Sequence, residues 1–175
     1  MARLTFILLG SLLASFVTAA PIPVNSVVAR ATFTEQAYSA FQISDGIGGN
    51  AEAEANAVFV DPFDGVDLTT VSSDELTAIN NMREAAESAE TDEFDPQIEA
   101  ASGAAADALS VGKTKNKVLK LAGEVQGITI KIAQAKANGE DTSDLESSLS
   151  EEQTKLNTNI AADKANAGKA SKGVV

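Results

Sequence analysis

The sequence lacks both cysteine and histidine, has no tryptophan and contains a single tyrosine. Without cysteine there is no disulfide framework, no thiolate nucleophile and no sulfur ligand for zinc or an iron–sulfur cluster. Without histidine, the chain also lacks the residue on which most catalytic triads, proton shuttles and transition-metal sites depend. These absences argue against most metal centres and leave carboxylates, hydroxyls and lysines as the groups available for catalysis.

A carboxylate-based enzyme is itself disfavoured by the composition. Glycoside hydrolases use paired Asp or Glu residues, but their clefts normally carry aromatic platforms for sugar rings, and aromatic residues make up only 5% of this chain. No serine or lysine lies in a recognisable nucleophile motif. We therefore expect a protein that is not an enzyme, with no catalytic, cofactor-binding or metal-binding residues.

The charge is strongly negative and unevenly distributed. The chain has 25 acidic and 13 basic residues, for a net charge of −12, which argues against a nucleic-acid partner because phosphates are neutralised by Lys and Arg. Between Ala31 and Asp107 there are 17 acidic residues and one basic residue, whereas Ala108 to Val175 holds 8 acidic and 10 basic residues. The two halves therefore carry complementary charge.

The N-terminus has the pattern of a secretory signal peptide. A short basic start ending at Arg3 is followed by the apolar run from Leu4 to Val17 and by small residues before Pro21. The run is shorter than the ~20 residues that a membrane span requires. We predict a signal peptide over residues 1–19, no membrane span, and an extracellular or cell-wall location. Residues 20–31 are either a linker or a short pro-segment that is cut after Arg30.

Helical signals begin at residue 32. Thr32 with Glu35 fits a capping box, and Thr34 is an alternative N-cap, so either predicts a helix whose apolar positions include Phe33 and Phe41. The Gly-rich stretch over residues 45–50 interrupts this helix, and residues 51–59 resume it. Residues 60–68 form a predicted loop.

Two further helices follow this loop. A capping box formed by Ser72 and Glu75 predicts a helix that continues to Ala89. Residues 91–95 are predicted to separate it from a third helix, which has Pro96 in its first turn and Leu109 on its apolar face.

The strongest pattern lies in the C-terminal part of the chain. An aliphatic stripe running from Val118 to Ala135 at three- and four-residue steps predicts a helix of about 25 residues that ends at Asn138-Gly139. Ser143 is the predicted N-cap of a final helix, which carries Leu145, Leu149, Leu156 and Ile160 on one face. The short polar connection predicts an antiparallel hairpin over residues 113–168.

These elements define an all-α fold. We predict a single bundle of four or five helices over residues 32–168, with a long C-terminal antiparallel helical hairpin, and a flexible tail over residues 169–175.

Two charged clusters are candidate sites. Asp61, Asp64 and Asp67 lie close to Gly65 and offer oxygen ligands for calcium, but the loop fails the EF-hand pattern, so we favour a capped surface turn. Four lysines, 113, 115, 117 and 120, crowd the predicted start of the long helix. We expect them to pair with the acidic run from Glu84 to Glu99, and the alternative partner is an acidic lipid or polysaccharide.

Two stretches carry a resemblance to a known group of proteins. Phe41-Gln42-Ile43-Ser44-Asp45-Gly46 and the stretch from Val111 to Val118, with the signal peptide, resemble a family of uncharacterised, cysteine-free small secreted proteins of filamentous ascomycete fungi. The resemblance implies a fungal extracellular protein that acts at the cell wall or a host surface. It supplies no activity, cofactor or functional residue.

The favoured function is therefore non-enzymatic surface contact at the fungal cell wall, a hydrophobic substrate or host tissue. The partners would be a cell-wall polysaccharide or a hydrophobic surface. A second hypothesis is an extracellular carrier of small apolar ligands such as lipids, because an Ala-rich core of helices can open around an apolar guest. A third is a secreted effector-like protein.

Overall fold

The computed structural model describes residues 32–175, so the predicted signal peptide (1–19) and the linker or pro-segment (20–31) lie outside the described residues. The helices are α1 (Tyr38–Phe41), α2 (Ala51–Phe59), α3 (Ser73–Ser88), α4 (Asp95–Ala100), α5 (Ala104–Ala137) and α6 (Ser143–Ala165), with short 3₁₀ helices η1 (Asp61–Phe63) and η2 (Leu68–Thr70) and a π-helix η3 (Ala89–Phe94). Two short strands, β1 (Gly46–Ile47) and β2 (Ala170–Ser171), pair antiparallel. The predicted all-α class is confirmed.

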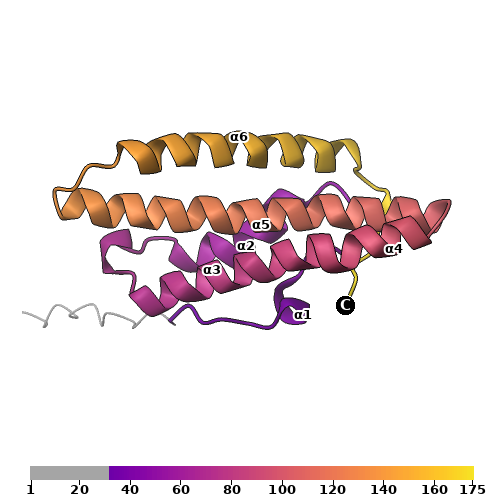
Figure 1. The fold of residues 1–175 in the computed structure, drawn as a ribbon, viewed down its shortest axis with the longest axis horizontal. Helices are drawn as coiled ribbons and strands as arrows, with labels where there is room; N and C mark the ends of the chain where they lie inside the picture. The colour runs from indigo at the N-terminus through magenta and orange to yellow at the C-terminus, as the bar shows by residue number, and fades with distance from the viewer. Residues whose placement is uncertain (1–31) are drawn as a thin grey trace, which may run out of the picture. The chain divides into compact units, whose positions relative to one another are not determined.

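Helix α5 is the central element of the fold. In Figure 1 it lies between α6 on one side and α2 and α3 on the other, and it contacts all three. Because α5 and α6 run antiparallel and pack along their lengths, the predicted C-terminal hairpin is confirmed. Helix α5 ends at Ala137 with Asn138 as its C-cap, in agreement with the predicted end at Asn138-Gly139, and Gly139 follows in the left-handed region (φ 73°) that favours glycine.

The capping box of α3 forms as predicted. The Ser72 hydroxyl accepts a hydrogen bond from the Glu75 backbone N–H at 3.2 Å, and the Glu75 carboxylate accepts one from the Ser72 N–H at 3.0 Å. The same carboxylate also accepts the backbone N–H of Phe33 at 3.0 Å. Glu75 therefore caps a helix and fastens the preceding segment to it.

The predicted helix from residue 32 is wrong. Neither Thr32 nor Thr34 caps a helix, because residues 32–37 are non-helical and α1 covers only Tyr38–Phe41. The physical reason is tertiary burial: the rings of Phe33 and Phe63 pack with centroids 5.3 Å apart, and Phe41 packs against Phe59 at 6.2 Å. The non-helical segment places Phe33 in the core, and the short helix α1 places Phe41 there.

The predicted break at residues 91–95 is also wrong. The chain runs from α3 through η3 into α4, with Pro96 in the first turn of α4 as predicted. The π-helix buries Phe94 completely within this continuous path. The break occurs instead at residues 101–103, so Leu109 belongs to α5. Helix α5 therefore has 34 residues instead of about 25.

Two predicted boundaries at the C-terminal side also move. Thr142, not Ser143, is the N-cap of α6, and the Asp141 carboxylate accepts the Ser143 backbone N–H at 3.0 Å. The segment predicted as a flexible tail is packed instead. The Lys172 backbone N–H donates to the Ala108 carbonyl at 3.0 Å, and the Gly173 N–H donates to the Asp45 carboxylate at 2.8 Å.

Buried polar groups fasten the N-terminal segment to α5. The Tyr38 hydroxyl donates to the Asn116 side-chain oxygen at 2.9 Å, and the Asn116 amide donates to the Ala86 carbonyl at 2.7 Å. The pKa of Tyr38 is raised from 10.0 to about 12, mainly by burial; a hydrogen bond from Ser44 lowers it, and the negative charge of Asp45 contributes to the rise.

We therefore expect the tyrosinate absorbance at 295 nm to rise with a midpoint near pH 12 in the folded protein. Since this is the only tyrosine and there is no tryptophan, the signal belongs to one group. The stabilisation linked to this shift is complete below about pH 10 and is lost as the pH rises toward 12. A midpoint near 10 without unfolding would contradict the half-buried position of Tyr38.

Candidate functional site

A cavity of about 230 Å³ lies among α2, α5 and α6. Aliphatic side chains from all three helices and from Val60 form most of its wall, namely Ala55, Val60, Val118, Ala122, Val125, Leu156 and Ile160. Taking roughly 30 Å³ per atom, the share of one water molecule in the liquid, this volume holds about eight non-hydrogen atoms. The cavity is therefore large enough for a small organic molecule.

Small side chains make this space. Ala55 on α2 and Ala122 on α5 are both buried, and each presents only a methyl group to the region where the helices meet. Larger residues at either position would fill the volume to the density of an ordinary core. The Ala-rich core that suggested a carrier thus leaves space at one specific place.

Four carboxamides line the same cavity. Asn56 comes from α2, Gln126 from α5, and Gln153 and Asn157 from α6. The Gln153 amide donates to the Asn157 side-chain oxygen at 3.2 Å. These groups give an otherwise aliphatic space a set of neutral hydrogen-bond donors and acceptors.

Gln126 differs from the other three amides. It is only 8% exposed, and within residues 32–175 no hydrogen bond joins its side chain to another group. Its amide atoms are not sealed from solvent, but an apolar ligand that covered them would leave the amide without a partner, which is unfavourable by about 1 to 3 kcal/mol. Gln126 is therefore the group in this cavity that has the most to gain from a ligand.

An ion pair bridges the rim of the cavity. The Lys164 ammonium on α6 lies 2.7 Å from the Glu52 carboxylate on α2, and both side chains are largely exposed. An exposed pair of this kind contributes at most ~1 kcal/mol. It connects α2 to α6 beside the cavity.

The predicted pairing of the lysines with the acidic run is confirmed for three of them. Lys113, Lys117 and Lys120 all approach the Glu90 carboxylate, at 3.8, 3.2 and 2.9 Å, and Lys113 also bonds to Asp95. Burial alone would raise the pKa of Glu90, but hydrogen bonds and charges from Lys120 and Lys117 outweigh it and hold this pKa below its ordinary value. These lysines lie inside α5, beyond its first turn.

Lys115 departs from this prediction. It is fully buried, pairs with Glu54 at 2.8 Å and donates to the Asp45 and Ile47 carbonyls at 3.0 and 3.2 Å. Its role is to hold the 45–47 segment on α5. The lysine row is therefore satisfied by groups of the same domain.

The acidic loop forms the capped turn that we favoured. The Asp67 carboxylate accepts hydrogen bonds from the Thr69 backbone N–H and hydroxyl, at 3.0 and 2.7 Å, and thereby caps η2. Asp61 and Asp64 do not join it in a cluster. In the part of the chain that the structure describes, no three acidic residues are grouped so as to hold a metal ion.

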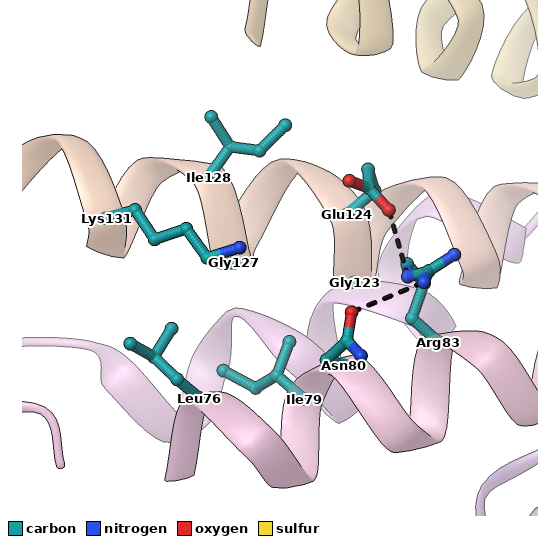
Figure 2. A pocket seen from close by; sticks show the side chains of 9 residues that line it. All are labelled: Leu76, Ile79, Asn80, Arg83, Gly123, Glu124, Gly127, Ile128 and Lys131. Carbon is teal, nitrogen blue, oxygen red and sulfur yellow. Dashed lines mark hydrogen bonds and ion pairs between the residues drawn. The ribbon is translucent and has the colours of Figure 1, made fainter. Parts of the chain in front are cut away.

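A second hollow lies between α3 and α5, and Figure 2 shows it. Arg83 spans it: its Nε lies 3.0 Å from a Glu124 oxygen, and its guanidinium lies 3.3 Å from the Asn80 side-chain oxygen. The hollow has a volume of about 20 Å³, which is enough for about one water molecule. It is a packing gap beside an ion pair and offers no ligand site.

Sequence reasoning identified the aliphatic stripe but missed the cavity and its amides. Asn56, Gln126 and Asn157 lie far apart in the chain, and only the packing of three helices brings them together. The one signal in the sequence was a polar carboxamide, Gln126, directly beside Val125 in the stripe.

Comparison with known proteins places the chain in a family. A family model described as a domain of unknown function (DUF8454) matches residues 33–175, and the chain belongs to this family. No curated protein and no solved structure matches the chain. Among residues 32–175, no helix combines the length and apolar character needed to cross a bilayer.

Proposed function

We propose that this is an exported fungal protein, without enzymatic activity, that carries small apolar molecules in the cavity among α2, α5 and α6. The observation that carries the proposal is a mostly aliphatic cavity of about 230 Å³ with a few polar groups on its wall. Ligand sites in proteins combine an apolar wall with a few such groups. The signal-peptide pattern and the resemblance to fungal secreted proteins support export.

The geometry of the hairpin supports ligand entry. Helix α6 packs mainly on α5 and buries only Leu156, Ile160 and Asp163. Two of these, Leu156 and Ile160, line the cavity. A displacement of α6 from α2 would open the cavity and would break the exposed ion pair of Lys164 with Glu52. Toward the C-terminal end of α6 it would also break the two hydrogen bonds that the buried Asp163 carboxylate accepts from the start of α2.

Native mass spectrometry of protein taken from culture medium tests the carrier function. We expect a non-covalent adduct of small-molecule mass on the wild-type protein. Ala122→Leu should reduce its occupancy at least about tenfold, because the added carbons occupy the cavity. Ala162→Leu, on the exposed surface of α6, is the matched control and should retain the adduct. Ligand-free wild-type protein that also fails to take up added apolar compounds would contradict the proposal.

Surface contact is the second candidate function. The observation that favours it is the exposure of α6, whose outer surface carries uncharged hydroxyl and amide groups such as Ser147, Ser150, Thr154 and Thr158. Such groups can hydrogen-bond to a neutral polysaccharide. Retention on chitin, glucan or a hydrophobic resin by protein without an adduct would favour contact at the cell wall, a hydrophobic substrate or host tissue over the carrier.

A further inference from the structure

The unpartnered amide of Gln126 defines what the cavity binds. Gln126 lies on α5, more than nine-tenths buried, and it lines the cavity beside the aliphatic residues Val118, Ala122 and Val125. Its nitrogen donates two hydrogen bonds and its oxygen accepts two. A ligand that fills only the apolar space leaves this amide unsatisfied, whereas a ligand with a hydroxyl or carbonyl group at that point satisfies it.

The charges around the cavity select against an ionised ligand. Among residues 32–175, Glu52 is the only charged residue that lines it, and Glu52 already pairs with Lys164 at 2.7 Å. A carboxylate ligand would approach this negative charge and would lose its hydration in a mostly aliphatic space. A cation would have to displace Lys164 to gain a partner. The remaining polar groups on the wall are the neutral amides of Asn56, Gln126, Gln153 and Asn157.

We infer that the ligand is a small neutral molecule with an apolar body and one hydroxyl or carbonyl group, which hydrogen-bonds to Gln126. The inference rests on the proposed carrier function and specifies its ligand class. A molecule of about eight non-hydrogen atoms matches the volume, at roughly 30 Å³ per atom. The apolar body lies against the walls from α2, α5 and α6.

Three matched probes test the ligand class by ¹H–¹⁵N NMR titration of the ¹⁵N-labelled protein. Ethylbenzene, 2-phenylethanol and phenylacetate share one apolar body and differ in having no polar group, a neutral hydroxyl or an anionic carboxylate. We expect 2-phenylethanol to bind about tenfold more tightly than ethylbenzene, since an amide–hydroxyl bond in a buried site commonly gives such a factor. Phenylacetate should bind most weakly at pH 7.

The Gln126→Leu variant tests whether the Gln126 amide causes the preference for 2-phenylethanol over ethylbenzene. It should bind ethylbenzene at least as tightly as the wild type and lose the preference for 2-phenylethanol. Gln97→Leu, the same change on α4 away from the cavity, should leave both affinities unchanged. Should Gln126→Leu fail to fold, the wild-type side-chain amide resonance of Gln126 gives the answer, because 2-phenylethanol should shift it much more than ethylbenzene.

The outcomes of this titration distinguish the carrier function from the ligand class. Equal affinity for ethylbenzene and 2-phenylethanol, or tightest binding of phenylacetate, would overturn the ligand class and leave the carrier function standing. Binding of none of the three probes would overturn both.

Discussion

Substitution of Lys115 by methionine should lower the free energy of unfolding by about 2 to 4 kcal/mol. Lys115 is fully buried. Its ammonium donates hydrogen bonds to the Asp45 and Ile47 carbonyls and forms an ion pair with the Glu54 carboxylate. Methionine retains the apolar stem, so the change removes the charged head and leaves these acceptors without their donor. Urea unfolding followed by far-UV circular dichroism gives the difference in stability.

A matched lysine on the same helix is the control. Lys131 is exposed, and no ion pair joins it to another of the described residues, so Lys131→Met should change stability by no more than about 0.5 kcal/mol. In Lys115→Met, hydrogen exchange should accelerate first at residues 45–48 and in the β1–β2 pair, because Lys115 holds this segment on α5. Equal stability of the two variants would show that the buried ammonium does not fasten the segment.

The long helices could be predicted because their signals are local and periodic. The aliphatic stripe of α5, the glycine at 139 and the Ser72–Glu75 capping box each depend on residues within a few positions of one another. No distant contact is needed to form them, so a single sequence contains the necessary information. The hairpin then follows from the shortness of its connection.

The incorrect predictions, in contrast, concern features that depend on contacts between residues far apart in the chain. The non-helical segment over residues 32–37 is fixed by the contact of Phe33 with Glu75, which are 42 positions apart, and this contact overrides a local capping pattern. Lys115 belongs to a row of lysines that look alike in sequence, and only the path of the 45–47 segment separates it from its neighbours. Tertiary contacts therefore determine both the path of residues 32–37 and the partners of Lys115.

The cavity could not be predicted for a related reason. An alanine in a helix is compatible with close packing or with a gap, and the outcome depends on the residue that faces it. Ala55 and Ala122 leave a gap at the place where α2, α5 and α6 meet. Whether Gln126 is buried likewise depends on which neighbouring helices cover this part of α5.

The largest effect of any substitution should come from Leu121→Asp. Leu121 belongs to the main core cluster together with Val118, Leu119 and Ile130 of the same helix. An aspartate there places an unpaired carboxylate among aliphatic and aromatic side chains, which costs several kcal/mol, on the order of the whole stability of a domain of this size. We expect loss of cooperative thermal unfolding and a marked loss of helical circular dichroism at 25 °C.

Ile132→Asp should act differently, although Ile132 is also buried. Ile132 lies outside the main cluster, toward the end of α5 where the hairpin turns, and the first residues of α6 there, Leu145 and Leu149, are only half-buried. The carboxylate can reach water if this part of α6 separates from α5. Most helicity should therefore remain, while hydrogen exchange accelerates in the first half of α6.

The exposed Ile47→Asp is the control for both variants and should change stability by no more than about 0.5 kcal/mol. Full helicity and cooperative unfolding in Leu121→Asp would mean that the aliphatic stripe of α5 is not the core. An equal loss of helical circular dichroism in Leu121→Asp and Ile132→Asp would mean that the hairpin cannot open at its turn. Ligand entry would then require α6 to move at its other end, where the Asp163 carboxylate accepts the backbone N–H groups of Gly49 and Ala51 at 2.9 Å.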